Sequence, residues 1–413
     1  MPVRSNIRPD MARLWSTLMQ SAEIGATSRG GVRRLALSEE DGAMRRVFRD
    51  WCASAGCRVQ IDAVGNMIAE RAGTDQHGKA VLVGSHLDTQ FRGGRFDGIL
   101  GVLAGLEIIR TLNDHGIATR LPIAVVNWTN EEGARFEPPM IGSAVFTGER
   151  SADFALGRLD RDGIGLGEAL AQIGFLGTDT LSPERCDSLF ELHIEQGPRL
   201  EAEGVQVGVV TGAFSVRGFV VEVTGETGHV GPTPMSERRN ALVGAAHVTL
   251  AIDEIGWSTH ESGGKSTTMR IKAEPNLLGA LPDRVEMTCD MRHAEDAVVE
   301  RMMASFRQQI PVLEEKSRCH IAICEAWTYG GMQFDAGCTA LVREAAEALG
   351  YSHTDMLTEA GHDAMHIAAH LPTAMIFTPC QGGLSHNEAE NVTLNQIEPA
   401  MNALWQAVLA RAL

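Results

Sequence analysis

Apolar positions in the first half of the chain fall into short continuous runs and one long helical stripe. Runs at residues 81–83, 121–128 and 188–194 are typical of buried strands. After the first run, apolar residues at 99, 102, 103, 106, 109 and 112 repeat with the 3.6-residue period of a helix. Strands that alternate with helices indicate an α/β fold. The flanking elements that we predict are helices at 10–20, 38–55, 338–349 and 394–413, a hairpin at 58–61 and 66–70, and a strand at 373–377.

The pattern changes between residues 213 and 329. Strand, helix, strand, strand, helix and strand follow one another there, which is the order of a ferredoxin-like split βαβ unit. The predicted elements are 216–223, 237–255, 267–272, 284–292, 295–310 and 320–325. We therefore expect an inserted ferredoxin-like α+β domain at 213–329, between the two parts of a catalytic domain at 1–212 and 330–413.

The composition argues against several classes of protein. The 36 Lys and Arg residues against 53 Asp and Glu give a formal charge of −17, which disfavours nucleic acid as a partner. No apolar run approaches the length of a membrane span, and the N-terminus lacks the apolar segment of a secretion signal. The eight cysteines are scattered without a CxxC pair, which indicates reduced thiols. We expect a cytoplasmic protein with no membrane or nucleic-acid partner.

Side chains that can bind a metal ion lie at the ends of three predicted strands. His86 and Asp97 follow the first strand, Glu132 follows the second, and His193 lies at the end of the third. Open α/β sheets place their ligand sites at these strand ends. Adjacent carboxylates such as Glu131 and Glu132 are costly there unless a positive charge lies beside them. A metal cation would explain them.

Together with a histidine in a loop near the C-terminus, these side chains predict a catalytic centre. Imidazoles and carboxylates without thiolate suit Zn, Mn, Co or Ni and favour a catalytic over a structural site. Five protein ligands are too many for one open zinc site, but they suit two metal ions that share a carboxylate. Glu131 would then be the general base, and Asp88 would hold the second ring nitrogen of His86. The five candidate ligands are His86, Asp97, Glu132, His193 and His386.

Longer motifs resemble a known family. They are HLDT with GGRFDG, TNEEG, ELHIEQG, TGETGHVGPTPM, PNLLGALPDRV with CDMRH, AGHDA and GGLSHNE. In this order they resemble the amidase, hydantoinase and carbamoylase branch of the dinuclear zinc peptidase superfamily, over nearly the whole chain. The branch includes N-carbamoyl-L-amino-acid hydrolases, β-ureidopropionases and allantoate amidohydrolases. The resemblance implies a mixed-sheet catalytic domain of the dinuclear metallopeptidase type and an inserted domain that dimerises and acts as a lid.

The resemblance also assigns the ligands. It implies that one metal ion takes His86, His193 and Asp97. The other ion takes Glu132, His386 and the same Asp97. We therefore expect two divalent metal ions per subunit, with zinc favoured and Mn, Co or Ni open.

Residues outside the ligand set match substrate-binding positions of the family. His229 resembles a lid histidine that reaches the site of a neighbouring subunit and stabilises the oxyanion. Asn276 and Arg292 resemble a clamp for the substrate carboxylate, which a guanidinium matches bidentately. An ion pair of Arg292 with Asp290 or Asp283, and a simple turn position for His229, remain open. The full set of expected substrate-binding residues is Gln196, His229, Asn276, Arg292, Gly361 and Gly383.

The expected reaction is hydrolysis of a ureido or amide C–N bond in a small carboxylated substrate. N-carbamoyl-L-amino acids or 3-ureidopropionate are favoured, and would give an amino acid, carbon dioxide and ammonia. Allantoate amidohydrolase is the first alternative, and an N-acyl-amino-acid deacylase or small peptidase is the second. A non-catalytic relative that only binds metabolites would be expected to have lost ligands or the base. The resemblance further implies a homodimer.

Overall fold

The structure is a computed structural model that describes residues 6–413. The chain divides into two compact units. The first contains the chain up to Thr211 together with Phe334–Met356 and Gly361–Leu413, and the second contains Gly212–Gln333 and Leu357–Ala360. The segment expected to be inserted, 213–329, lies within the second unit. Its role as a lid and dimerisation domain stays a prediction.

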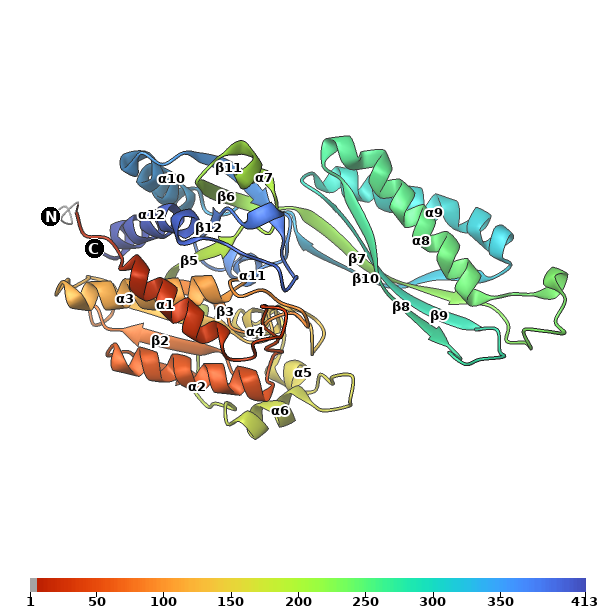
Figure 1. Cartoon of the computed structure of the whole chain (residues 1–413), viewed down its shortest axis with the longest axis horizontal. Helices are drawn as coiled ribbons and strands as arrows, with labels where there is room; N and C mark the ends of the chain where they lie inside the picture. The colour runs from red at the N-terminus through yellow and green to blue at the C-terminus, as the bar shows by residue number, and fades with distance from the viewer. Residues whose placement is uncertain (1–5) are drawn as a thin grey trace. The chain divides into compact units, whose positions relative to one another are not determined.

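An eight-stranded mixed sheet forms the centre of the first unit (Figure 1). Four inner strands, β4, β3, β5 and β12, are parallel to one another, whereas β1, β2 and β6 pair antiparallel with their neighbours. Parallel neighbours share one carboxyl edge, so the loops that follow the inner strands meet on the same side of the sheet. In sheet order the strands are β1 Arg58–Ile61, β2 Met67–Arg71, β4 Ile123–Trp128, β3 Ala80–His86, β5 Cys186–Ile194, β12 Thr373–Thr378, β6 Val207–Ala213 and β11 His353–Thr358.

Helices cover this sheet and enclose one large hydrophobic core. Helices α3 and α12 pack against inner strands, α1 contacts both of them, and α11 contacts β12 and α4 (Figure 1). Strands β3, β4 and β12 are buried along their whole length, as their apolar runs require. The helices are α1 Met11–Ala22, α2 Glu39–Ser54, α3 Ile99–Asp114, α4 Ile141–Phe146, α5 Ala152–Leu156, α6 Leu166–Ile173, α7 Arg199–Glu203, α10 Ala336–Leu349, α11 Asp363–Ala368 and α12 Leu394–Ala412.

Helix α3 follows the candidate ligand Asp97 in the chain and packs on the large sheet. It begins directly after Asp97 and Gly98 and packs against β3, β4 and β5. The expected apolar stripe is buried, but so are most of the other positions of the helix. Gly101 permits this close approach, because a Cβ there would lie 2.6 Å from the carbonyl oxygen of Leu192 in β5. The start of α3 is therefore held tightly against the strand that carries His193.

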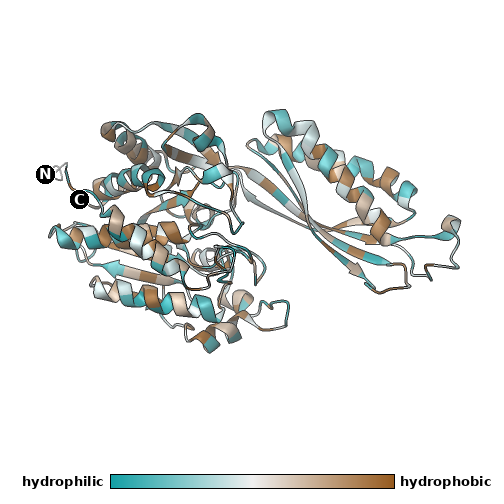
Figure 2. Cartoon of the chain, viewed as in Figure 1, coloured by the Kyte–Doolittle hydropathy of each residue, from teal (hydrophilic) through white to brown (hydrophobic). Residues whose placement is uncertain are grey.

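The second unit is a four-stranded antiparallel sheet, in the order β10-β7-β9-β8, with two helices packed on it (Figure 1). Its chain order is that of a split βαβ unit, as the sequence predicts. Hydrophobic residues recur along its strands and both helices (Figure 2), and many of them form a separate core. The elements are β7 Ser215–Thr224, α8 Ala241–Thr259, β8 Lys265–Glu274, β9 Arg284–His293, α9 Asp296–Ser317 and β10 His320–Gly330.

Several elements differ from the sequence prediction. The helix expected at 295–310 continues through Pro311 to Ser317, because burial of Leu313 in the core outweighs the hydrogen bond that a proline removes. The helix expected from residue 237 begins only at Ala241, where the side chain of Asn240 accepts the backbone N–H of Leu242. Strands β6 and β11 and helix α11 were not predicted. Strand β11 reads HTDMLT, which has too few apolar residues to give a strand signal.

Among residues 6–413, no helix combines the length and apolar character needed to cross a membrane.

Candidate metal centre

The predicted ligands come together at the carboxyl edge of the large sheet. His86 is the last residue of β3, and His193 is the last but one of β5. Glu132 lies in the turn after β4, and His386 lies in the loop after β12. Asp97 lies two residues before Ile99, the first residue of α3. Four parallel strands and one helix thus supply the five side chains.

Asp97 lies between two sets of ligand atoms. Its Oδ1 is 3.1 Å from Nε2 of His193 and 3.8 Å from Nε2 of His86. Its Oδ2 is 3.5 Å from Nε2 of His386, which is itself 3.3 Å from Oε2 of Glu132. Each oxygen of one carboxylate therefore faces a different group of ligands, as expected for a carboxylate that bridges two metal ions.

The donor atoms fit a pair of divalent cations. In each of the two groups, ligand atoms from all three residues lie within 4.8 Å of one another. Two ligands bound to one ion at about 2.0–2.2 Å lie at most about 4.4 Å apart, and the distances of 3.1–3.8 Å given above meet this limit. The groups are His86, Asp97 and His193, and Asp97, Glu132 and His386.

Buried negative charge also calls for cations at this position. Burial, and then neighbouring carboxylates, raise the pKa of Glu131 and of Glu132 well above their usual range. Burial raises the pKa of Asp88 to about 7. Burial alone would raise the pKa of Asp97, but the hydrogen bond and charge of His193, together with the charges of His386 and His86, lower it overall. Uncompensated carboxylates are costly in a protein interior, and bound divalent cations would remove this cost.

Backbone carbonyls orient both buried imidazoles. Nδ1 of His86 lies 2.9 Å from the carbonyl oxygen of Asp88, and Nδ1 of His193 lies 2.9 Å from the carbonyl oxygen of Ile194. A ring that donates from Nδ1 presents Nε2 as the lone-pair donor to a metal. In both residues Nε2 is the atom that faces Asp97.

Asp88 holds the second ring nitrogen of His86, as expected, but it does so through its backbone carbonyl. Its carboxylate does not hold the imidazole of His86, because the nearer Oδ1 is 3.9 Å from Nδ1 and the backbone carbonyl takes that hydrogen bond instead. The carboxylate accepts the backbone N–H groups of Glu131 and Glu132, each at 3.3 Å. Asp88 therefore fixes the turn that carries the candidate base and one ligand.

Glu131 and Glu132 diverge from this turn. Oε2 of Glu131 lies 3.4 Å from Nε2 of His86. Glu132 points to the other ligand group, and its two oxygens accept the backbone and side-chain N–H groups of Gln90 at 3.0 and 2.9 Å. The carboxylates of these two adjacent residues therefore point to different groups of ligands in the same candidate centre.

Two of the expected substrate-binding residues lie beside Asp97. Nε2 of Gln196 donates to Oδ2 of Asp97 at 3.0 Å and to the hydroxyl of Ser385 at 3.1 Å. Gly383 lies two residues before Ser385 with a φ of +64°, and a Cβ there would lie 2.5 Å from the backbone nitrogen of Pro198. Only glycine fits this close approach. Contact of either residue with a substrate remains a prediction.

The other expected substrate-binding residues are spread over both units. Gly361 precedes His362 in the first unit. In the second unit, His229 and Asn276 are exposed. Arg292 lies on β9, where its Nε donates to Asp290 at 2.7 Å and its Nη1 donates to the carbonyl of Glu359 at 2.8 Å. The ion pair with Asp290 that was left open from the sequence is therefore present, and the carboxylate clamp stays a prediction.

Comparison with known proteins agrees with this geometry. The family model described as peptidase family M20/M25/M40 matches residues 82–410. The chain belongs to this family. It is 41% identical to the N-carbamoyl-L-amino-acid amidohydrolase of Rhizobium meliloti over 98% of each chain, and 32% identical to the allantoate amidohydrolase of Bacillus subtilis over 93% of each chain. The crystal structure of an amidase of the hydantoinase/carbamoylase family from Burkholderia vietnamiensis has 45% identity and a TM-score of 0.94 over 99% of each chain. The resemblance predicted from the motifs is confirmed.

In this M20/M25/M40 family member, further residues at the centre had escaped the sequence analysis. His362 is buried, and its ring centroid lies 4.6 Å from that of His193. Glu191, His193 and His362 form a third group of close ligand atoms, in which Glu191 also accepts the hydroxyl of Ser85 at 2.6 Å. The motif AGHDA, which includes His362, is the feature of the sequence that pointed to this residue. Glu191 and His193 are two positions apart in β5, so their side chains lie on the same face of the strand. Glu195 is not part of this group, because its carboxylate accepts backbone N–H groups at the start of α7.

Glu390 is a further residue that the sequence did not single out. Its Oε1 accepts the backbone N–H groups of Phe96 and Asp97 at 3.2 and 3.1 Å, and its Oε2 accepts the hydroxyl of Ser385 at 3.3 Å. A side chain at Gly94 would collide with it. Glu390 therefore joins the loop that carries Asp97 to the loop that carries His386.

We predict that Glu390→Ala weakens metal binding. The substitution removes three hydrogen bonds that position the loops carrying Asp97 and His386, and loss of such outer partners costs roughly 10- to 100-fold in metal affinity. Competition with a chromophoric chelator measures the dissociation constant. The control is Glu398→Ala on the exposed side of α12. Unchanged metal affinity in Glu390→Ala would remove this positioning role.

Proposed function

We propose that the protein is a metal-dependent amidohydrolase that cleaves the ureido C–N bond of N-carbamoyl-L-amino acids. The observation that carries this proposal is the buried carboxylate of Asp97, which faces two ligand groups and has Glu131 close by. The similarity to a protein named N-carbamoyl-L-amino-acid amidohydrolase over nearly the full length supports the choice of substrate. Allantoate is the second candidate, because a relative of that name is 32% identical over 93% of this chain.

Two divalent cations per subunit are part of the proposal, with zinc favoured by the histidine and carboxylate donors. His86, His193 and Asp97 would hold one ion, and Glu132, His386 and Asp97 would hold the other. When bound, such a pair acidifies a water molecule and polarises the substrate carbonyl.

Glu131 is proposed as the general base and acid. Its carboxylate lies next to one ligand group without belonging to it, at 3.4 Å from Nε2 of His86. From this position Glu131 takes the proton of the attacking water and returns it to the leaving nitrogen. Asp88 keeps it there by accepting its backbone N–H. Hydrolysis then gives the amino acid and carbamate, which decomposes to carbon dioxide and ammonia.

The remaining residues are proposed to bind the substrate. Arg292 and Asn276 hold the carboxylate, and His229 donates to the oxygen that becomes negative during attack. Gln196 and the backbone at Gly361 and Gly383 contact the ureido end. Closure of the second unit as a lid would bring the first three groups to the metals and exclude water.

A homodimer is proposed through the second unit. Helix α8 leaves large apolar side chains exposed, among them Leu250 at 60% and Trp257 at 65%. Strand β8 lies at the edge of its sheet and exposes Met269 and Ile271. Exposed apolar residues beside an unpaired strand edge are typical of an interface. A cytoplasmic location is also proposed, and the eight free thiols of the chain agree with a reducing compartment.

The function is tested by ammonia release from metal-loaded protein on a panel of N-carbamoyl-L-amino acids, 3-ureidopropionate and allantoate, with amine release from N-acetyl amino acids measured in parallel. We expect the highest kcat/KM on a carbamoyl amino acid. In Glu131→Gln, turnover should fall by at least about 10³-fold while two metal ions remain bound, because the amide cannot accept the proton.

Highest activity on allantoate would replace the favoured substrate with the second candidate. Activity on N-acetyl amino acids alone would make the protein a deacylase. Full turnover by Glu131→Gln would contradict the proposed mechanism.

For the carboxylate clamp we predict that Arg292→Lys raises KM for a carbamoyl amino acid at least tenfold. Lysine keeps the positive charge beside Asp290 but loses the bidentate fork. An uncharged amide of the same substrate should show a much smaller change. Arg217→Lys, in the neighbouring strand β7, is the control because its partners are exposed carboxylates. An equal KM in Arg292→Lys and wild type would exclude the clamp.

For the dimer we predict that the double variant Leu250→Glu and Trp257→Glu sediments as a monomer while wild type sediments as a dimer. Two buried charges in an apolar interface cost several kcal/mol. The control is Leu159→Glu, which places a charge on an equally exposed leucine of the first unit. A monomeric wild type would contradict the proposal, as would a double variant that remains dimeric.

A further inference from the structure

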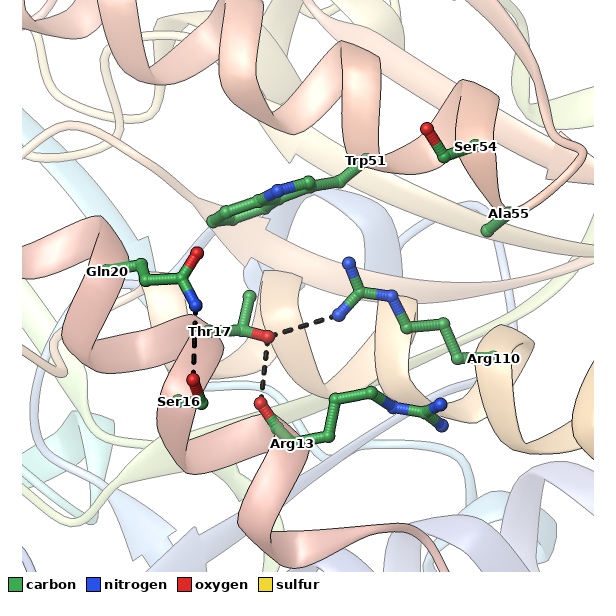
Figure 3. Close-up of a pocket in the computed structure, with 8 residues that line it drawn as sticks. All are labelled: Arg13, Ser16, Thr17, Gln20, Trp51, Ser54, Ala55 and Arg110. Carbon is green, nitrogen blue, oxygen red and sulfur yellow. Dashed lines mark hydrogen bonds between the residues drawn. The ribbon is translucent and has the colours of Figure 1, made fainter.

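A cavity of about 420 Å³ lies between helices α1, α2 and α3 of the first unit (Figure 3). Its walls are polar and aromatic, and they include Arg13, Thr17, Gln20, Trp51, Ser54 and Arg110. Arg110 follows Asp97 by 13 positions, so at about 1.5 Å per residue it lies roughly 20 Å along α3 from the metal centre. The cavity is therefore separate from the candidate catalytic site.

The two arginines of the cavity differ in their partners. Arg13 donates to Glu107 from Nη2 and Nε at 2.7 and 2.9 Å, and to Asp114 from Nη1 at 2.7 Å. Arg110 is half-buried and donates from Nη1 to the hydroxyl of Thr17 at 3.1 Å. Within residues 6–413, no carboxylate oxygen lies within 4.0 Å of the Arg110 guanidinium. Glu107 and Asp114 thus contact Arg13 directly, whereas they act on Arg110 only through their charge at longer range.

Trp51 supplies an aromatic surface beside this cation. The Cζ atom of Arg110 lies over the Trp51 ring, 5.8 Å from its centroid, and the half-buried indole packs against the core of the first unit. Figure 3 shows the indole and the Arg110 guanidinium bordering the same hollow, with Gln20 near the indole. A flat ring packs well on an indole, and a carboxylate or phosphate matches the free N–H groups of a guanidinium. The volume is within the usual range of small-molecule sites.

We propose that this cavity binds a small aromatic anion. Its ring lies on Trp51 and its carboxylate or phosphate accepts hydrogen bonds from Arg110. Gln20, which donates to the hydroxyl of Ser16 at 3.1 Å, borders the site and offers its remaining polar atoms to ring substituents. This binding site is independent of the proposed catalytic function.

The test is a titration of 4-fluorobenzoate into the metal-loaded protein, followed by fluorine NMR. We expect saturable binding to wild type and to the control Arg161→Gln, an exposed arginine away from the cavity. Arg110→Gln and Trp51→Leu should raise the dissociation constant at least tenfold, and neutral 4-fluorobenzamide should bind wild type at least tenfold more weakly. Competition by phenyl phosphate identifies which anionic group is preferred. Arg110→Lys and Trp51→Phe, which keep the charge and the ring, should retain part of the affinity.

Absence of binding to wild type would overturn the proposal, and so would equal affinity in wild type and Arg110→Gln. Because a carboxylate also suits a metal centre, 4-bromobenzoate in crystals of the metal-loaded protein locates the bound molecule by anomalous scattering of bromine. A bromine peak between Trp51 and Arg110 supports the site, whereas a peak at the metal centre alone contradicts it.

Discussion

Electrostatic repulsion among buried carboxylates is the constraint on which the centre of this protein depends. Asp88, Asp97, Glu131 and Glu132 are buried together at one edge of the large sheet. Such a cluster is stable only if protons or cations compensate its charge. The carboxylate of Asp97 faces both groups of imidazole and carboxylate ligands, so two cations on its two sides would meet this requirement with one shared ligand.

The surrounding fold holds this cluster through the backbone more than through other side chains. Carbonyl groups orient His86 and His193, and amide groups bind the carboxylates of Asp88 and Glu390. Backbone groups at the ends of parallel strands are fixed by the sheet, so the ligands they orient are fixed as well. Helix α3 adds to this rigidity because its Gly101 lies directly against Leu192 of β5. The arrangement of the candidate metal ligands is therefore fixed within the first unit.

Strands that are buried along most of their length could be predicted from the sequence, and so could the candidate ligands at their ends. Apolar runs marked β3, β4 and β5, and the ligand types that follow them indicated a metal centre before any contact was known. The roles of side chains whose partners lie far away in the sequence were harder to predict. Asp88 is close to His86 in the chain, yet its carboxylate binds amides from a different strand end. Glu390 acts on residues almost 300 positions away, and no local pattern encodes such a contact.

Tertiary contacts explain why other predictions differed from the structure. The polar strand β11 takes its place in the sheet without an apolar run, and α9 passes through Pro311 because its later turns pack on a core. Local propensity gives way to tertiary packing in both cases.

The ion pair of Arg292 with Asp290 was one of two readings that the sequence allowed, and its presence still leaves the guanidinium a candidate for substrate binding.

The most direct test of this account is anomalous diffraction at the zinc edge from crystals of the zinc-loaded protein. The account predicts two peaks roughly 3.5–4 Å apart, with one oxygen of Asp97 bound to each. The peak beside His86 and His193 and the peak beside Glu132 and His386 should have comparable occupancy. A single peak at full zinc loading would contradict the shared-carboxylate centre, as would two peaks that do not both contact Asp97.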